Sequence, residues 1–267
     1  MASPRPAPLT SLPRSEARAV QGLLTDIDDT LTTDGRLAPE ARDALDALRA
    51  AGLPVIAVTG RPMGWSMEFA RSWPVEAIVA ENGAVALFVE QGDLTIEYAQ
   101  DEPTRLHNAA RLRAAAARVL REVPGSALAQ DSAGRVTDIA IDHAEHAHLS
   151  DSQIAQVVAV MQAEGMNATV SSIHVNGWYG DHDKLSGARW IVRRRLGREL
   201  DAQTAHWVYV GDSTNDQQMF GHFELSVGVA NLLHFADRLT TWPAYLTQLE
   251  RGAGFAEVAR HLIDARR

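Results

Sequence analysis

Short apolar runs that predict buried strands alternate with stretches of helical spacing in the first and last parts of the chain. The first part contains predicted strands at 20–27, 53–58 and 77–80, and predicted helices at 39–51 and 63–72. The last part contains predicted helices at 184–196 and 255–265, and predicted strands at 206–210 and 225–229. This order is typical of an α/β protein whose parallel sheet is covered by helices.

The middle of the chain follows a different pattern. Two strands around a Gln-Gly-Asp turn are predicted at 84–99, and a second hairpin is predicted at 126–142. Helices at 104–121 and 151–164 and a strand at 168–175 accompany them. We therefore expect an α+β cap at 100–180 inserted into a discontinuous core at 19–99 and 181–267. The Pro-rich residues 1–18 are predicted to form a disordered or loosely attached tail.

Composition narrows the possible functions. The 267 residues carry a formal net charge of −9, which argues against a nucleic-acid partner or an anionic membrane surface. The absence of cysteine excludes disulfides, thiolate metal sites and a cysteine nucleophile. No apolar run is long enough to span a membrane and no signal peptide is visible, so we expect a cytoplasmic protein. The oligomeric state does not follow from the sequence.

The sharpest local feature is an acidic cluster directly after the first predicted strand. Asp26 and Asp28 stand two residues apart, at the edge where open α/β sheets bind ligands. Two close carboxylates cannot both stay ionised without a cation or a shared proton. A solvated Asp-rich turn is the alternative. A calcium loop does not fit, because Leu31 and Leu37 replace its glycine and glutamate.

Three further features lie at equivalent places in the core. Thr59, Gly60 and Arg61 follow the next strand, where a hydroxyl, a flexible backbone and a guanidinium could hold an anion, although Thr-Gly is also common turn chemistry. A later strand is followed by two acids in the run Gly211–Asp216, which could equally be helix capping. Lys184 opens the predicted helix before that strand. Each feature has an ordinary structural explanation by itself, and their joint order is the informative observation.

In this order, the features resemble the four motifs of the haloacid dehalogenase superfamily of phosphohydrolases. The resemblance rests on Asp26–Thr30, Thr59, Lys184 and Gly211–Asp216, with Glu81–Ala84 after the third strand. It implies a Rossmann-like core with a large α+β cap between the second and third motifs. The subgroup with such a cap includes Cof-like phosphatases, sucrose- and trehalose-phosphate phosphatases and phosphomannomutases.

The resemblance also implies roles for the residues. Asp26 would attack phosphorus and become an aspartyl phosphate, and Asp28 would act as general acid and then base. Mg²⁺ would be held by Asp26, the Asp28 backbone carbonyl and Asp212, with Asp216 orienting these ligands or binding the metal itself. Thr59, Gly60 and Lys184 would bind the phosphoryl oxygens. Arg61, Asn82 and Asn215 would contact the substrate at the rim. Independently of the resemblance, Ser172, His174 and Asn176 alternate along a predicted strand and so share one face, which could line the substrate pocket or equally be an exposed face of a sheet.

The predicted function is therefore Mg²⁺-dependent hydrolysis of a small phosphate ester, with a sugar phosphate as the expected substrate class. A hexose phosphomutase using the same intermediate and a non-catalytic sugar-phosphate-binding protein are the alternatives. One position departs from the family pattern. Asp29 stands where glycine is usual, and we expect its side chain to point to solvent.

Overall fold

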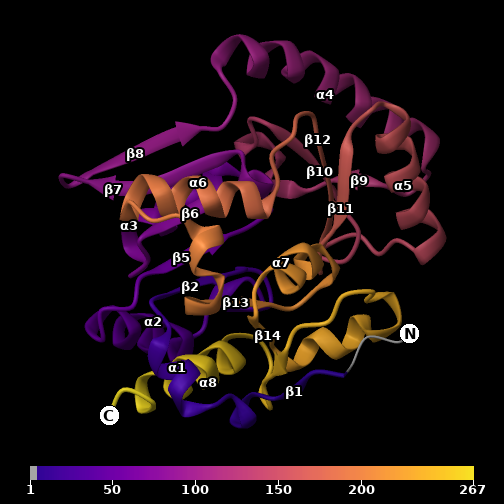
Figure 1. Cartoon of the computed structure of the whole chain (residues 1–267). Helices are drawn as coiled ribbons and strands as arrows, with labels where there is room; N and C mark the ends of the chain where they lie inside the picture. The colour runs from indigo at the N-terminus through magenta and orange to yellow at the C-terminus, as the bar shows by residue number, and fades with distance from the viewer. Residues whose placement is uncertain (1–4) are drawn as a thin grey trace.

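The computed structural model describes residues 5–267, and its main feature is a nine-stranded sheet (Figure 1). Six neighbouring pairs at one side of the sheet are parallel, and two antiparallel strands extend the other side. The strands are, in spatial order, β1 (Ala7–Pro8), β15 (Tyr245–Leu246), β14 (Leu225–Gly228), β13 (Trp207–Gly211), β2 (Gly22–Thr25), β5 (Val55–Val58), β6 (Ala77–Ala80), β7 (Val85–Glu90) and β8 (Asp93–Tyr98). The predicted α/β class with a mainly parallel sheet is confirmed.

Helices cover both faces of this sheet because its central strands are apolar on both sides. In β2, Leu23 packs against one helix layer and Leu24 against the other, as strand alternation requires. One layer contains α1 (Arg14–Ala19), α2 (Pro39–Ala50), α3 (Met63–Ser72) and α8 (Arg251–Asp264). The opposite layer contains α6 (Lys184–Leu196) and α7 (Gln217–His222). Short 3-10 segments join these elements at η1 (Leu9–Ser11), η2 (Glu81–Gly83), η4 (Leu200–His206), η5 (Thr214–Asp216) and η6 (Ala230–Arg238), and a small hairpin is formed by β3 (Thr32–Thr33) and β4 (Arg36–Leu37).

A second, antiparallel sheet is formed by the residues that stand between the two parts of the core in the chain. Its order is β11 (Asn167–Val170), β12 (His174–Trp178), β10 (Asp138–Asp142) and β9 (Ala127–Leu128), with η3 (Gln130–Gly134) before β10. One face packs on α4 (Glu102–Glu122) and α5 (Asp151–Ala163), which lie on the side away from the large sheet (Figure 1). The other face bears polar side chains toward the core. We propose that the chain divides into a core at 19–99 and 181–267 and a cap at 100–180.

Two local predictions are corrected by the structure. The predicted loose tail is ordered from residue 5, because Leu9, Leu12 and Ala17 are buried in the core and β1 pairs with β15. Residues 1–4 of that tail lie outside the described part of the chain. The single strand predicted at 168–175 is instead two antiparallel strands, β11 and β12, with Ser171 at the turn between them. The apolar-polar pattern continues through this turn, so periodicity alone did not separate them.

Glu81 joins the core to the cap at the end of β6. Its buried carboxylate accepts hydrogen bonds from the backbone of Met63 in the core (2.9 Å) and of Thr137 in the cap (2.6 Å), and from Val136 N–H (3.1 Å). Glu81 itself has φ 48°, a left-handed conformation that is costly for a non-glycine residue. Gly83 has φ 105°, and a Cβ there would lie 2.0 Å from the Asp183 carbonyl oxygen. The chain is thus held in an unusual turn that brings core and cap into contact.

Replacing Glu81 by glutamine should loosen this joint. The carboxylate accepts only, whereas a glutamine amide would turn an NH₂ group toward at least one of these N–H donors. We expect the free energy of unfolding to fall by about 1–3 kcal/mol in urea titrations. Burial raises the pKa of Glu81 to about 7, so the titrations belong at pH 8, where the carboxylate is ionised. The variant Glu76→Gln, at a half-buried ion pair with Arg195, is the control, and equal unfolding midpoints for both variants would contradict the assignment.

Candidate active site

The residues predicted to carry chemistry come together at one edge of the large sheet. Asp26 follows β2, Thr59 follows β5 and Asp212 follows β13, and these three strands are parallel neighbours. Their carboxyl ends therefore meet at a single edge, on either side of the central strand β2. The backbone confirms this register, since Asp26 N–H donates to the carbonyl of Val210 at 2.9 Å.

Lys184 lies between two of the acids. Its Nζ is 2.6 Å from Asp26 Oδ1 and 2.7 Å from Asp216 Oδ1, and all three side chains are buried. Burial, opposed by Lys184 and aided by the negative charges of Asp216 and Asp28, raises the pKa of Asp26 to about 8. Burial also disfavours the ammonium, but Asp216 and Asp26 together raise the pKa of Lys184 above its ordinary value. The site therefore retains its lysine as a cation.

Lys184 is the single lysine of the chain, beside 24 arginines. An ammonium is a compact point charge on a flexible stem, whereas a guanidinium is a planar fork that suits two oxygens of one group. Two separate carboxylates are met here by one nitrogen. The α6 helix begins at this residue, capped by Asp183, whose side chain accepts from Ser186 N–H, so the start of the helix fixes the lysine backbone.

Asp212 is the acid that the lysine does not reach. It is fully buried, and its two oxygens accept only from neutral donors, Thr30 Oγ1 at 3.4 Å and Asn231 Nδ2 at 3.2 Å. Among residues 5–267, no basic side chain forms an ion pair with it. Burial, aided by the nearby Asp26 and Asp216, raises its pKa well above the ordinary value.

This arrangement fits a divalent cation. Asp26, Asp212 and Asp216 each offer an oxygen, and these three oxygens lie within 4.8 Å of one another. Carboxylate oxygens are the ligands that Mg²⁺ prefers. Asp216 is held by the N–H groups of Asp212 (2.9 Å) and Ser213 (3.1 Å), so its own position is fixed.

The sequence predicts that the Arg61 side chain could hold an anion, but in the structure its guanidinium is already paired with carboxylates. Its buried guanidinium donates to Asp28 (2.9 Å), and to two cap acids, Asp131 (3.2 Å) and Glu145 (3.0 Å). The Thr59 hydroxyl accepts from the Arg61 N–H at 3.0 Å. The turn therefore positions an arginine that bridges Asp28 to the cap, rather than one whose charge is available to an incoming anion.

The other predicted rim residues lie at the core–cap joint. Asn176 Nδ2 donates to the Gly60 carbonyl at 3.0 Å, and His174 Nε2 lies 2.9 Å from Glu145 Oε2. These two residues share one face of β12, as their spacing predicted. The remaining three predicted rim residues lie on either side: Asn82 donates to Asp138 in the cap, Ser172 lies beside Asp29, and Asn215 lines a pocket with Lys184.

Asp29 does not project freely into solvent, contrary to the expectation. Its side chain is 22% exposed and pairs with Arg251 at 3.2 Å, and its carbonyl accepts from Asn231 at 3.0 Å. Its backbone has φ 54°, in the left-handed region where glycine is favoured and aspartate is tolerated. This conformation explains why a glycine fits the position, and the ion pair explains where the aspartate carboxylate goes.

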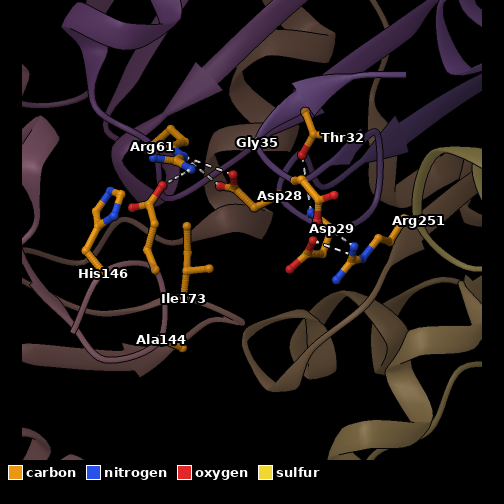
Figure 2. Close-up of a pocket in the computed structure, with 11 residues that line it drawn as sticks. Asp28, Asp29, Thr32, Gly35, Arg61, Ala144, His146, Ile173 and Arg251 are labelled. Carbon is orange, nitrogen blue, oxygen red and sulfur yellow. Dashed lines mark hydrogen bonds and ion pairs between the residues drawn. The ribbon is translucent and has the colours of Figure 1, made fainter. Parts of the chain in front are cut away.

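Two pockets flank the buried acids. The larger, of about 390 Å³, opens between core and cap and is lined by Asp28 and Arg61 on one wall and by Arg251 and Asp29 on another (Figure 2). The smaller, of about 260 Å³, includes Lys184. Figure 2 shows the Arg61–Asp28 and Arg251–Asp29 pairs on opposite sides of the larger pocket, with His146 and Ile173 from the cap. Of these two pockets, only the larger is lined by Asp28.

Sequence reasoning missed several residues that shape the site. Asn231 follows β14, so its place after a core strand was a signal of the same kind as the acids. The cap contributors had no such signal, because they come from loops whose neighbours only the fold decides: Asp131, Arg135 and Glu145.

Comparison with known proteins agrees with this geometry. Residues 23–114 match the family model of haloacid dehalogenase-like hydrolases. A search of curated proteins finds no match.

Solved structures with the same fold cover nearly the whole chain. A Thermoplasma acidophilum protein has a TM-score of 0.68 at 14% identity, covering 91% of this chain and 98% of its own. A HAD/COF-like hydrolase from Plasmodium vivax has a TM-score of 0.68 at 17% identity, covering 94% and 99%. The sucrose-phosphatase of Synechocystis, solved with sucrose and phosphate, has a TM-score of 0.64 at 17% identity, covering 92% and 98%. The family match places residues 23–114 with the haloacid dehalogenase-like hydrolases, and these structures share the fold of nearly the whole chain.

Proposed function

We propose that this protein is a Mg²⁺-dependent phosphatase that acts on a small phosphate ester through a phosphorylated Asp26. The observation that carries the proposal is the buried group of Asp26, Asp212 and Asp216 around Lys184. In this group the carboxylate nucleophile, Asp26, lies beside one fixed cation, Lys184, and beside a site that would hold a second cation, Mg²⁺. Phosphoryl transfer requires this combination, because charge accumulates on the transferred oxygens.

The roles follow from position. Asp26 would form a bond to phosphorus while the ester oxygen leaves, and water would then attack the phosphorus and release Asp26 and inorganic phosphate. Asp28, two residues on and facing the larger pocket, would give a proton to the leaving oxygen and later take one from the water. Lys184, with Thr59 and the Gly60 amide, would hold the phosphoryl oxygens in place. Asp26 is a weak nucleophile, so this positioning supplies much of the acceleration.

Asp26, Asp212 and Asp216, with the Asp28 backbone carbonyl, are the groups that would hold Mg²⁺. The uncompensated burial of Asp212 supports this assignment, since a buried carboxylate without a cationic partner is costly. When bound, the ion would offset the repulsion between these acids and attract the phosphoryl oxygens.

A sugar phosphate is the substrate class that we infer. The Synechocystis neighbour that shares the fold is a sucrose-phosphatase with sucrose bound. Amide side chains suited to hydroxyl groups line the joint between core and cap here, among them Asn82, Asn176 and Asn215. No described helix is both long and apolar enough to cross a membrane.

Hydrolysis of p-nitrophenyl phosphate tests the proposal. We expect turnover with Mg²⁺, loss of turnover in excess EDTA and recovery when Mg²⁺ is restored. With a hexose phosphate, we expect release of inorganic phosphate and no isomerised hexose phosphate, which separates a phosphatase from a mutase. Unchanged turnover after removal of every divalent ion would contradict the metal assignment, and the absence of turnover with any phosphate ester would contradict the function.

A further inference from the structure

The cap loop after β10 is shaped to present one carboxylate to the active site. The two oxygens of the buried Asp142 accept from four successive backbone N–H groups, those of residues 144–147, at 2.9 to 3.2 Å. This wraps the loop around Asp142 and projects Glu145 toward the core. Glu145 is then fixed at both oxygens, by Arg61 at 3.0 Å and by His174 at 2.9 Å. A surface loop with this many constraints has a defined position, not a variable one.

Glu145 faces the pocket that must receive the leaving group. On the proposed function, the leaving oxygen lies at Asp28, and Asp28 lines the larger pocket together with Glu145 and Arg61. Glu145 and Asp28 bind different nitrogens of the same guanidinium, so the cap acid and the proton donor are linked through Arg61. The group attached to the departing oxygen would therefore extend past Asp28 toward Glu145.

The charge around this pocket is unfavourable for a second anion. Its lining contains four carboxylates and two guanidiniums among the described residues. Both guanidiniums are already paired, Arg61 as above and Arg251 with Asp29 and Asp34. The hydrogen bond from His174, with the charge of Arg61, lowers the pKa of Glu145 to about 2, so it is ionised at neutral pH. A carboxylate or second phosphate on the substrate would meet like charge and no unpaired guanidinium, which disfavours its binding.

We propose that Glu145 is a specificity-determining residue, which reserves the pocket for uncharged, hydroxyl-bearing leaving groups by adding a third carboxylate, beside Asp28 and Asp131, around the Arg61 charge. Hydroxyl groups suit this lining, because they donate to carboxylates and accept from the remaining guanidinium N–H groups. The inference rests on the proposed phosphatase function and narrows it. Monophosphates of neutral sugars or polyols fit, whereas sugar acid phosphates, phosphoglycerates and bisphosphates do not.

Matched pairs of substrates test the proposal. Phenyl phosphate and 4-carboxyphenyl phosphate differ by one carboxylate, and glucitol 6-phosphate and 6-phosphogluconate differ only by CH₂OH against carboxylate at C1. The assays use the wild-type protein with Mg²⁺ at pH 8, where an ordinary imidazole, with a pKa of about 6.5, is neutral. We expect kcat/KM to be at least about tenfold higher for the uncharged member of each pair, close to 1.4 kcal/mol. Equal values, or a preference for the carboxylate, would overturn the proposal.

The Glu145→Gln variant tests the residue itself. Glutamine keeps the size and can still accept from Arg61, but it leaves the guanidinium charge less compensated. We expect the preference for the uncharged substrate to fall at least fivefold, through a lower KM for the carboxylate substrate. Asp34→Asn removes one charge from the rim of the same pocket without touching Arg61, and should change the preference less than twofold.

The outcomes separate the two proposals. If the wild-type protein hydrolyses none of these four phosphate esters, the proposed function fails. If both members of a pair are hydrolysed and Glu145→Gln alters selectivity no more than Asp34→Asn, the specificity assignment fails while the phosphatase function stands.

Discussion

Replacing Asp26 by asparagine is expected to lower kcat for p-nitrophenyl phosphate by about 10⁴-fold or more, a loss typical of removing a catalytic nucleophile. An amide oxygen is a far weaker nucleophile than a carboxylate, and no other group can take its place at the end of β2. Asparagine has nearly the same volume, and Lys184 keeps its contact with Asp216, so the fold should be retained. Steady-state assays with Mg²⁺, alongside circular dichroism of the variant, measure both effects.

The control for this variant is Asp43→Asn, which removes a carboxylate from an exposed position on α2. It should keep wild-type turnover. Turnover of Asp26→Asn within a few-fold of wild type would show that another residue attacks phosphorus. Loss of turnover together with a broadened or lowered unfolding transition would show a structural role for Asp26 instead.

Replacing Lys184 by methionine should damage stability as well as activity. The variant leaves Asp26 and Asp216 buried without their cation, and breaking a buried pair in this way typically costs about 3–5 kcal/mol. Turnover should fall by about 10²- to 10³-fold, the usual loss when one group that stabilises transferred charge is removed. Unfolding in EDTA measures the first effect and assays with Mg²⁺ the second.

Mg²⁺ provides a sharper comparison for this variant. Because the metal would offset the same acids, it should raise the Tm of Lys184→Met more than that of the wild type. Lys184→Arg should not restore activity, since the larger, planar guanidinium cannot take the buried position from which one nitrogen contacts both Asp26 and Asp216. Arg49→Met, at an exposed ion pair on α2, should cost less than about 1 kcal/mol. Equal stability of Lys184→Met and wild type in EDTA would contradict the role assigned to the lysine.

Local periodicity was enough to predict most of the large sheet and its helices. Strands such as β2 and β5 are apolar throughout and are bounded by clear turn residues, so their hydrophobic runs are unambiguous. The N-terminal segment was mispredicted because its composition is polar and Pro-rich, while its few apolar residues, Leu9 and Leu12, pack against distant parts of the core. The β11–β12 hairpin was merged because one apolar pattern runs through both strands.

The sequence by itself determined which residues share the carboxyl edge of the parallel sheet. Asp26, Thr59 and Asp212 each follow a core strand, and parallel strands necessarily end together, so their meeting is a consequence of chain order. Only the tertiary structure decided their partners. Lys184 reaches Asp26 across 158 positions within the core, and Glu145 reaches Arg61 across 84 positions by a contact between cap and core. The positions of strands along the chain are encoded by local hydrophobic runs, whereas the pairing of charges depends on distances between segments that only the folded chain sets.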